Sequence, residues 1–312
     1  MKIPIRVRHD LWMGAQNTLC GTMTFADPVD NEPFEIAVPT GAAGPLVFAS
    51  PHSGGVRPDD LRPAAGVSIA SLRSAEDALV DRLIASAPGL GVPVIAGRIS
   101  RAYVDLNRAP DELDPALIPG AVADGAPPVS AKTAAGFGVI PRRAGDGAAL
   151  YDRPLPLDEA RARLRAVHAP YHAALSALME DARARHGRAI LIDWHSMPSR
   201  AAGGTRPAGP GRSPPGPDVV LGDRHGAACA SAVSRRVRGL FEAAGWRVGL
   251  NHPYAGGYTT QTWGRPAEGF EAIQIELNRA LYLDETTLAP GPGFDRCKRV
   301  IDRVIAALAA EV

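Results

Sequence analysis

The sequence predicts an α/β domain built around a largely parallel sheet. Short apolar and β-branched runs alternate along the chain with longer stretches rich in Ala, Leu and Arg at helical spacing, which is the pattern of such domains. Hydrophobic residues make up 46% of the 312 positions, enough for a large core. Residues 1–25 show no clear hydrophobic period and precede a second methionine, Met23. We therefore expect a flexible extension over 1–25 and a single domain over 26–312.

Six segments are expected to be strands because they are short and rich in Val, Ile, Leu or Phe. In chain order they are residues 44–50, 92–100, 102–106, 189–196, 246–251 and 270–279. The segment 189–196, "AILIDWHS", is expected to be buried on both faces, as parallel strands between two helical layers are.

Four segments are expected to be helices because their apolar residues recur every three or four positions. They are residues 77–87, 157–186, 226–245 and 294–312. Pro170 should kink or divide the second of them. Residues 109–151 and 200–218 fit neither pattern, and we expect loops that cover the carboxyl ends of strands, where ligand sites lie in α/β sheets.

The composition excludes several classes of protein. A net charge of +1 gives no electrostatic reason to bind nucleic acid or an anionic membrane. No segment approaches the about 20 apolar residues that a membrane helix needs. The three cysteines lie far apart, which argues against a disulfide framework or a thiolate zinc site. We expect a cytoplasmic protein, and a homo-oligomer remains open.

Polar side chains follow several of the predicted strands. His52 and His195 lie at or just beyond two strand ends, Asn107 and Arg108 follow a third, and Glu276 is near the end of a fourth. If these strands run parallel, the five side chains converge at one edge of the sheet.

Two histidines and an acid would suit a metal ion. Catalytic zinc takes three protein ligands, often neutral imidazoles with a carboxylate, and leaves one position open. His52 and His195 are the candidate imidazoles, and Glu76, Asp77 or Asp81 is the candidate acid. The alternative is structural: histidines at strand ends often only form hydrogen bonds, and acids in a first helical turn stabilise the helix dipole.

Glu276 lies within the apolar run "AIQIELNR". Burying a carboxylate costs several kcal/mol unless it is paired or its pKa rises, and a raised pKa suits a general base. A structural ion pair with Arg279 or Arg108 is the alternative. Serine chemistry is a weaker hypothesis, because no GxSxG motif is present and Ser53 and Ser196, each adjacent to a histidine, would point away from it.

Eight motifs in order resemble the N-formylglutamate amidohydrolase family, over about residues 36–308. They are "PHSG", "SRAYVDLNR", "GFGVIP", "PYH", "LIDWHSMPS", "PDVVLGDRHGAAC", "NHPYAGGYTTQTWG" and "AIQIELNRALYLDE". The resemblance implies a three-layer α/β/α fold around a mixed sheet, similar to that of zinc carboxypeptidases. It also implies one zinc ion and the hydrolysis of N-formyl-L-glutamate to formate and L-glutamate, a late step of histidine degradation.

The resemblance further implies roles for individual residues. His52, Asp77 and His195 would hold the zinc, with Glu76 as the fallback, while Glu276 would take a proton from the attacking water. Asp193 shares a strand face with His195 but is not expected to be its close partner. Another zinc amidohydrolase, acting on a different N-acyl amino acid or small peptide, and a non-catalytic metal-binding relative are the alternatives.

The substrate would be a small anion with two carboxylates, which needs more than one cationic anchor. Asn107 and Arg108 would grip one carboxylate, because a guanidinium matches its geometry. Candidates for the second anchor are Arg101, Arg142, Arg143, Arg200 and Arg265. A turn expected to face the substrate contains Tyr254, Gly256, Gly257 and Tyr258. The chain departs from the family at "SAEDALVDRL", where "DTDWHVDRL" is expected.

Overall fold

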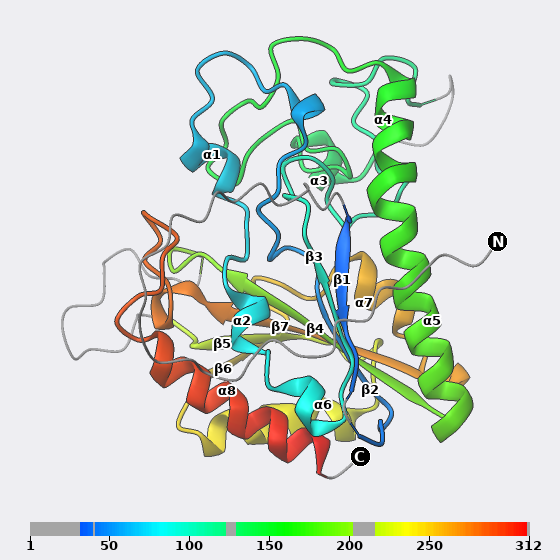
Figure 1. Ribbon diagram of the computed structural model, residues 1–312, viewed down its shortest axis with the longest axis vertical. Coiled ribbons are helices and arrows are strands. Elements are labelled where there is room, and N and C mark those ends of the chain that lie inside the picture. Colours follow the sequence, from blue (N-terminus) through cyan, green and yellow to red (C-terminus); the bar gives the residue numbers. More distant parts are fainter. Residues whose placement is uncertain (1–31, 40, 123–128, 202–215, 311–312) are drawn as a thin grey trace, which may run out of the picture.

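Figure 1 shows the computed structural model, which describes residues 32–39, 41–122, 129–201 and 216–310. Within these residues, seven strands form one sheet in the order β1-β3-β2-β4-β7-β5-β6. The strands are β1 Phe34–Ala37, β2 Leu46–Ser50, β3 Val94–Gly97, β4 Ala189–Met197, β5 Val219–Gly222, β6 Val248–Leu250 and β7 Phe270–Asn278. The four neighbours β3, β2, β4 and β7 run parallel. β1 is antiparallel to β3 and β5 is antiparallel to β7, whereas β5 and β6 are parallel to each other. The predicted mixed, mostly parallel sheet is confirmed.

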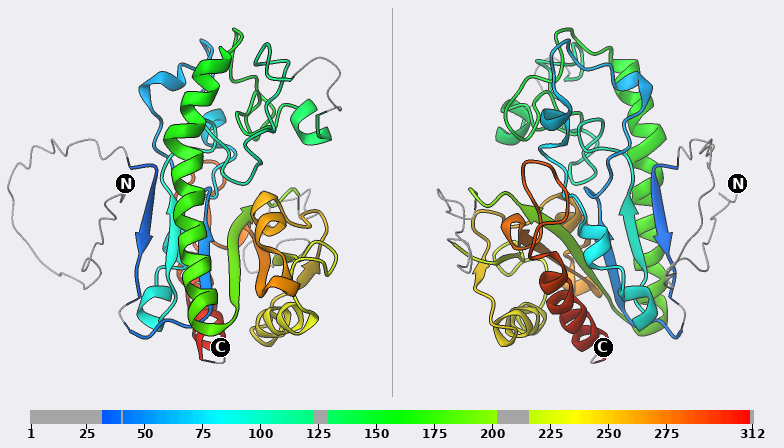
Figure 2. Two further views of the ribbon diagram at one scale, coloured as in Figure 1. Left: turned by 90° about the vertical axis from the view of Figure 1, so that its right-hand side faces the viewer. Right: turned by 60° about the vertical axis from the view of Figure 1, so that its left-hand side comes forward.

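Helices cover both faces of the sheet, so the predicted three layers are also confirmed (Figures 1 and 2). The helices are α1 Ile69–Arg73, α2 Val80–Leu83, α3 Ala131–Ala134, α4 Leu157–Arg163, α5 Ala169–His186, α6 Ser231–Ala243, α7 Tyr258–Trp263 and α8 Phe294–Ala309. Short 3₁₀ turns span Asp59–Leu61, Ala87–Leu90, Pro266–Glu268 and Arg279–Leu281.

Alternation along the strands divides the apolar residues between two cores. Leu191 and Ala272 face the layer of α5, where Tyr171 and Leu175 pack against them. Ile192 and Ile273, one residue further along, face α6 and α8 on the other side. Each core is continuous because successive side chains of a strand point to opposite faces.

The long helix continues past Pro170, so of the two predicted effects of this proline, a kink or a division, the division is not observed. A π-helical segment, Leu164–His168, joins α4 directly to α5. Proline has no N–H, and its ring would collide with the carbonyl four residues earlier in a regular α-helix. A wider turn before Pro170 accommodates the ring, and the helix continues to His186.

Other boundaries differ from the prediction. Residues 102–106 form turns instead of a strand, and β1 and β5 were not predicted. The helix predicted over 77–87 is reduced to α2, since Leu79 adopts a left-handed conformation with φ 67° directly before it. The helix predicted over 226–245 begins only at Ser231, after turns with positive φ at Arg224 and His225.

The described part of the predicted loop over 109–151 lies at one end of the molecule. In the described part of 109–151 only α3 is helical, and this segment gathers with α1 at the top of Figure 1. Most of the 200–218 segment, and the 1–25 extension, lie outside the described residues. The division into an extension and one domain over 26–312 stays a prediction. Among the helices that the structure describes, none has the length and apolar character needed to cross a membrane.

Replacing Ile273 with Ala should lower the free energy of unfolding by about 2–5 kcal/mol, because it leaves a cavity beneath a central strand. Ile69→Ala is the matched control. Ile69 in α1 is 57% exposed, so its replacement should lower the free energy of unfolding by less than about 0.5 kcal/mol. Urea unfolding measures both. Equal losses for the two variants would contradict this account of the core.

Candidate metal centre

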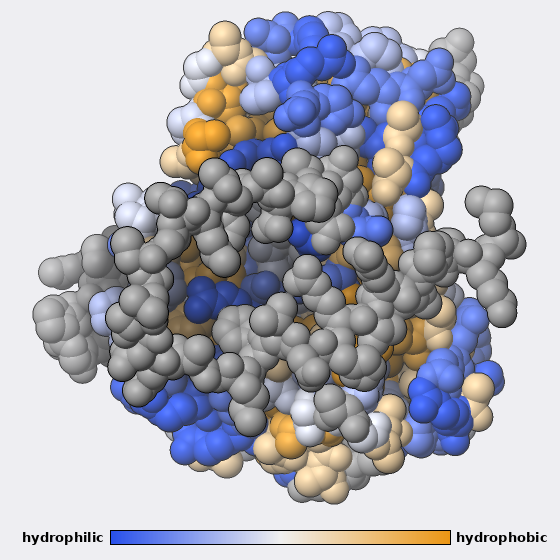
Figure 3. Space-filling view, in the orientation of Figure 1, coloured by the Kyte–Doolittle hydropathy of each residue, from blue (hydrophilic) through white to orange (hydrophobic). Residues whose placement is uncertain are grey.

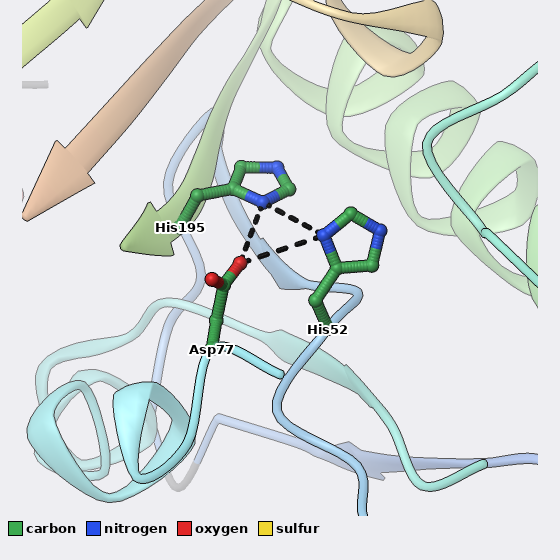
Figure 4. Close-up of side chains that lie close together, drawn as sticks. All are labelled: His52, Asp77 and His195. Carbon is green, nitrogen blue, oxygen red and sulfur yellow. Dashed lines mark hydrogen bonds and ion pairs between the residues drawn. The ribbon is translucent and has the colours of Figure 1, made fainter. Parts of the chain in front are cut away.

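Three side chains from distant parts of the chain converge on one buried point (Figure 4). The Nδ1 atoms of His52 and His195 lie 3.2 Å apart. Oδ2 of Asp77 lies 3.0 Å from Nδ1 of His195 and 3.4 Å from Nδ1 of His52. All three side chains are at most 3% exposed. The residues expected to hold a metal therefore lie together.

The spacing of these three atoms fits a tetrahedral ion. Bonds of about 2.0–2.1 Å at tetrahedral angles place neighbouring ligand atoms about 3.3 Å apart. The observed separations of 3.0, 3.2 and 3.4 Å bracket that value. Two imidazoles and one carboxylate also form a ligand set typical of catalytic zinc, with a fourth position left for a reactant. This group of side chains can hold a divalent metal ion.

The fold brings the three ligands together through the sheet. His195 lies on β4, and His52 lies in the turn that follows the neighbouring parallel strand β2. Asp77 lies in a turn just before α2, and its backbone N–H donates to the carbonyl of His52 at 2.9 Å. That bond fixes the carboxylate beside the imidazole. The convergence of His52 and His195 follows directly from the parallel pairing of β2 and β4.

The far nitrogen of each imidazole faces a carboxylate. Nε2 of His52 lies 2.7 Å from Oδ1 of Asp105. Nε2 of His195 lies 3.0 Å from Oδ2 of Asp193. A carboxylate at the far nitrogen holds the proton there and leaves the near nitrogen free to bind a metal. Both histidines thus have the arrangement of a metal ligand.

The Asp193 contact corrects the expectation that this residue is not a close partner of His195. Residues two apart on a strand share a face, and here the two side chains are long enough to meet. The angles are not those of a regular hydrogen bond, and neither oxygen of Asp193 has such a bond within the described residues. The contact is an ion pair when His195 is protonated.

The second oxygen of Asp77 is held by partners that the sequence did not suggest. Oδ1 accepts hydrogen bonds from Nη2 of Arg279 at 3.0 Å and from Oγ of Ser196 at 3.1 Å. Arg279 is 5% exposed, so this ion pair is buried. It differs from the pairing of Arg279 with Glu276 that was considered from the sequence. The fallback acid Glu76 instead pairs with Nε of Arg73 at 2.9 Å and is not one of the three converging ligands.

The pKa values of Asp77 and His195 depend strongly on each other and on the charges around them. Burial disfavours the ionised Asp77 carboxyl, but hydrogen bonds from His195 and His52 and the charge of Arg279 hold its pKa well below the usual range. Burial also opposes protonation of His195, yet the carboxylates around it, Asp193 first, raise its pKa. The raised pKa favours the protonated imidazolium, so a metal ion that binds Nδ1 would have to displace a proton there.

Glu276 lies beside this cluster on β7. It is the register partner of His195 on the adjacent parallel strand, and Gln274 donates to its Oε1 at 2.7 Å. Burial raises the pKa of Glu276 to about 7, although nearby His195 lowers it. A cation held by the three ligands would lower it further. A carboxylate of this kind can exchange protons near neutral pH.

Asn107 is turned toward protein partners. Its Oδ1 accepts from the N–H of Thr259 at 2.9 Å and from that residue's hydroxyl at 3.0 Å. Its Nδ2 lies 3.2 Å from Nε2 of His195 and 3.4 Å from Oε1 of Gln274. The side chain thus joins the turn after Asp105 to α7, and its amide nitrogen lies beside the metal ligand His195. The expected grip on a substrate carboxylate stays a prediction.

Two of the arginines predicted to anchor substrate, Arg108 and Arg101, differ in their contacts. Nε of Arg108 donates to the carbonyl of Phe137 at 2.9 Å, and the side chain is 11% exposed. Nε of Arg101 donates to Oδ2 of Asp105 at 2.9 Å, and the side chain is 26% exposed. Arg101 also interacts electrostatically with Asp77 and Glu276. Of the arginines predicted to anchor a substrate carboxylate, Arg101 is therefore the one whose charge acts on the cluster.

Arg265 lies away from the other predicted site residues. It pairs with Phe270 at the start of β7, six residues and about 20 Å along the strand from Glu276. Its Nη1 also bonds Glu268 at 2.6 Å. Arg265 thus lies beside the opposite end of β7 from Glu276, and its expected contact with substrate stays a prediction.

The three remaining candidate anchors are engaged elsewhere. Arg142 bonds Asp114 at 2.7 Å, Arg143 bonds the carbonyl of Gly147 at 2.9 Å, and Arg200 bonds the carbonyl of Gly145 at 3.3 Å. Arg200 lines a hollow of about 520 Å³ next to α1, whose lining includes none of the three metal-centre ligands. Apolar side chains gather beside α1 in Figure 3. These contacts place Arg142, Arg143 and Arg200 in the surrounding loops.

The two glycines of the turn before α7 allow close packing. Gly256 has a φ of 119°, and a Cβ there would lie 2.4 Å from Oγ1 of Thr260. A Cβ on Gly257 would lie 2.5 Å from the amide of Asn107. Tyr254, earlier in the turn, is half-buried, and its pKa is raised by burial and by the charge of Glu276. The turn lies against the site, and its contact with substrate stays a prediction.

The serines next to the histidines are bound to other groups. Ser53 Oγ lies 2.5 Å from Oγ of Ser50, and Ser196 bonds Asp77 and Arg279. Neither serine is hydrogen-bonded to an imidazole within the described residues. The arrangement therefore favours metal chemistry over a nucleophilic serine.

The departure at "SAEDALVDRL" affects packing. Ala78 is 4% exposed and lies in the core that faces α8. Leu79, which stands where the resemblance leads us to expect histidine, has a φ of 67°, a conformation that His adopts more readily than Leu. Asp77 keeps its place in the metal centre.

Asp105→Asn should weaken zinc binding by about 10–100-fold, because it removes the carboxylate that orients His52. Competition with a chelating dye measures the affinity. Asp218→Asn is the control, since Asp218 is also buried and ion-paired, with Arg247, but lies outside the cluster. Unchanged affinity in Asp105→Asn would refute the orienting role.

Comparison with known proteins identifies the family. The sequence matches the family described as N-formylglutamate amidohydrolase over residues 44–283. It is 32% identical to the N-formylglutamate deformylase of Pseudomonas putida over 245 residues, which cover 78% of this chain and 83% of that protein. The protein of the same name from Pseudomonas aeruginosa is also 32% identical, over 247 residues, 77% of this chain and 83% of the relative.

Comparison with solved structures supports the same family. The crystal structure of an N-formylglutamate amidohydrolase from Ralstonia eutropha superposes with a TM-score of 0.81 at 34% identity, covering 90% of this chain and 98% of the other. A protein from Agrobacterium tumefaciens, at 17% identity and a TM-score of 0.58, shares the fold. The predicted class, an amidohydrolase that cleaves a linear carbon–nitrogen bond, is confirmed. The chain belongs to the N-formylglutamate amidohydrolase family.

Proposed function

We propose that this protein is a zinc-dependent enzyme that hydrolyses N-formyl-L-glutamate to formate and L-glutamate. The observation that carries the proposal is the buried group of His52, Asp77 and His195, spaced for a tetrahedral ion next to Glu276. The names of its relatives support the substrate. A small anionic molecule is therefore the proposed partner.

His52, Asp77 and His195 would hold the ion through Nδ1, Oδ2 and Nδ1. When bound, zinc would acidify a water molecule and polarise the formyl carbonyl. Glu276 would accept a proton from the attacking water at a carboxylate oxygen and return it to the leaving nitrogen. Its burial among β-strand residues keeps it basic enough for this task.

Arg101 is the proposed cation for a substrate carboxylate. Its Nε is held by Asp105, which fixes the guanidinium, while 26% of the side chain remains exposed. Arg108 has less exposed surface and is tied to the carbonyl of Phe137, so it would need to move to reach a ligand. This difference favours Arg101 over Arg108 as the anchor.

The decisive experiment combines metal analysis of the purified protein with formate release from N-formyl-L-glutamate. We expect about one zinc per chain and formate formation that a chelator abolishes and zinc restores. A panel of other N-acyl amino acids and small formyl peptides tests the substrate. Turnover confined to another acyl group would keep the metal site and reject N-formylglutamate, whereas a protein without bound metal would reject the whole proposal.

Glu276→Gln should keep its zinc and lose turnover by about 10²–10⁴-fold, because the amide cannot accept the proton. Steady-state rates and metal content are measured on the same preparation. Glu271→Gln is the matched control, since Glu271 lies on the same strand but bonds the backbone N–H of Ala230. Substantial residual turnover in Glu276→Gln would reject its assignment as the base.

His195→Ala should lose the metal together with activity, because only two of the three ligands remain. Zinc content after dialysis is the measurement. His186→Ala, at the exposed end of α5, controls for the general loss of a histidine. Full zinc occupancy in His195→Ala would show that the ligand set is wrong.

A further inference from the structure

Two histidines outside the metal centre bind the backbone on either side of Asn107. Nε2 of His172, on α5, lies 2.9 Å from the carbonyl oxygen of Leu106. Nε2 of His168, one turn earlier, lies 2.9 Å from the carbonyl oxygen of Arg108. The carbonyls that flank Asn107 are thus both bound by side chains of the same helix.

These two hydrogen bonds determine which nitrogen of each imidazole carries the hydrogen. A carbonyl oxygen only accepts, so each Nε2 carries a hydrogen and donates it. His168 is 4% exposed, and burial lowers its pKa. Burial and the neighbouring His168 lower the pKa of His172 to about 3. The lowered pKa values favour neutral rings, and the bonds to the two carbonyl oxygens place the hydrogen of each ring on Nε2.

The same two rings contact the second segment that Asn107 binds. The Tyr258 ring centroid lies 5.2 Å from that of His172 and 6.0 Å from that of His168. Tyr258 begins α7, and the next residue, Thr259, donates to Oδ1 of Asn107. The histidines thus touch both halves of the Asn107–Thr259 contact.

The irregular part of the long helix ends at the first of these histidines. The π-helical turn Leu164–His168 accommodates Pro170 and ends at His168, and regular α-helix then places His172 four residues further on the same face. Such π segments occur often at functional sites. The motif "PYH", residues 170–172, contains both Pro170 and His172 and has no other task in the proposed reaction.

We infer that His168 and His172 are positioning residues that hold the Leu106–Arg108 turn and α7 against the metal centre. By fixing the turn they fix the Asn107 amide, whose nitrogen lies 3.2 Å from Nε2 of His195. They touch no ligand atom themselves. The consequence for catalysis rests on the proposed function, whereas the consequence for the turn does not.

Replacements at His172 test whether the turn requires a hydrogen-bond donor at the position of Nε2 or only a side chain of similar volume. Glutamine places its amide nitrogen near the position of Nε2, asparagine places it near Nδ1, and phenylalanine keeps the ring without a donor. Amide hydrogen exchange of the full-length protein reports on the turn and on α7, at the N–H groups of Asn107 and Thr259. His186→Asn, on the exposed end of the same helix, is the control.

We expect exchange at Asn107 and Thr259 to be about tenfold faster in His172→Phe and His172→Asn, the loss expected for one hydrogen bond, and within about threefold of wild type in His172→Gln. Turnover of N-formyl-L-glutamate should follow the same order. If no variant hydrolyses that substrate, the proposed function is rejected, whereas the order of the amide exchange rates still tests the inference about the turn.

Equal exchange in the Gln, Asn and Phe variants at both amides would overturn the inference, whether they are all protected or all fast. If His172→Phe does not fold, the Gln and Asn variants at His172, together with the same pair at His168, carry the comparison. Gln rescue at both positions supports the inference, and absence of any difference between Gln and Asn rejects it.

Discussion

The site depends on holding three electron-rich atoms of two histidines and an aspartate within 3.4 Å of one another in the protein interior. Such atoms repel unless protons or a cation lie between them, and their burial makes that repulsion costly. Partners on the outer side of each ligand counter it: Asp105 at His52, Asp193 at His195, and Arg279 with Ser196 at Asp77. The remaining polar contacts of the site extend from these partners.

The sheet explains how these residues come together. β2, β4 and β7 are parallel neighbours, so the turn after β2 and the last residues of β4 and β7 meet at one edge. The register pairs His195 with Glu276, which places a candidate base beside a candidate ligand without any loop rearrangement. Asn107 then joins this edge to α7, and Gly257 lacks a side chain where the Asn107 amide must pass. His195 and Glu276 lie on regular strands, whose side chains are held more precisely than those of loops, whereas His52 and Asp77 lie in turns.

Much of the fold was predictable from pattern alone. Long apolar strands such as β4 and β7, and amphipathic helices such as α8, were found because each buries a face whose spacing is visible in the chain. Two short strands were not predicted: β1 and β5 have four residues each, and their pairing depends on strands far away in sequence. The run at 102–106 has strand-like composition but forms turns, and the turn carries Asp105 and Asn107 into the site.

The chemistry of the site could be predicted from the sequence. Two histidines, nearby acids and a glutamate in a buried strand predict metal-assisted hydrolysis, and the order of the motifs predicts the family. Local sequence could not choose between adjacent acids. Glu76 and Asp77 differ by one position, and only the folded backbone turns Asp77 toward the histidines and Glu76 toward Arg73. Nor could it separate Arg101 from Arg265, which the length of β7 places far from the centre. The reason is physical: a ligand set is decided by distances of a few ångströms between side chains more than 100 residues apart, and these distances exist only in the tertiary structure.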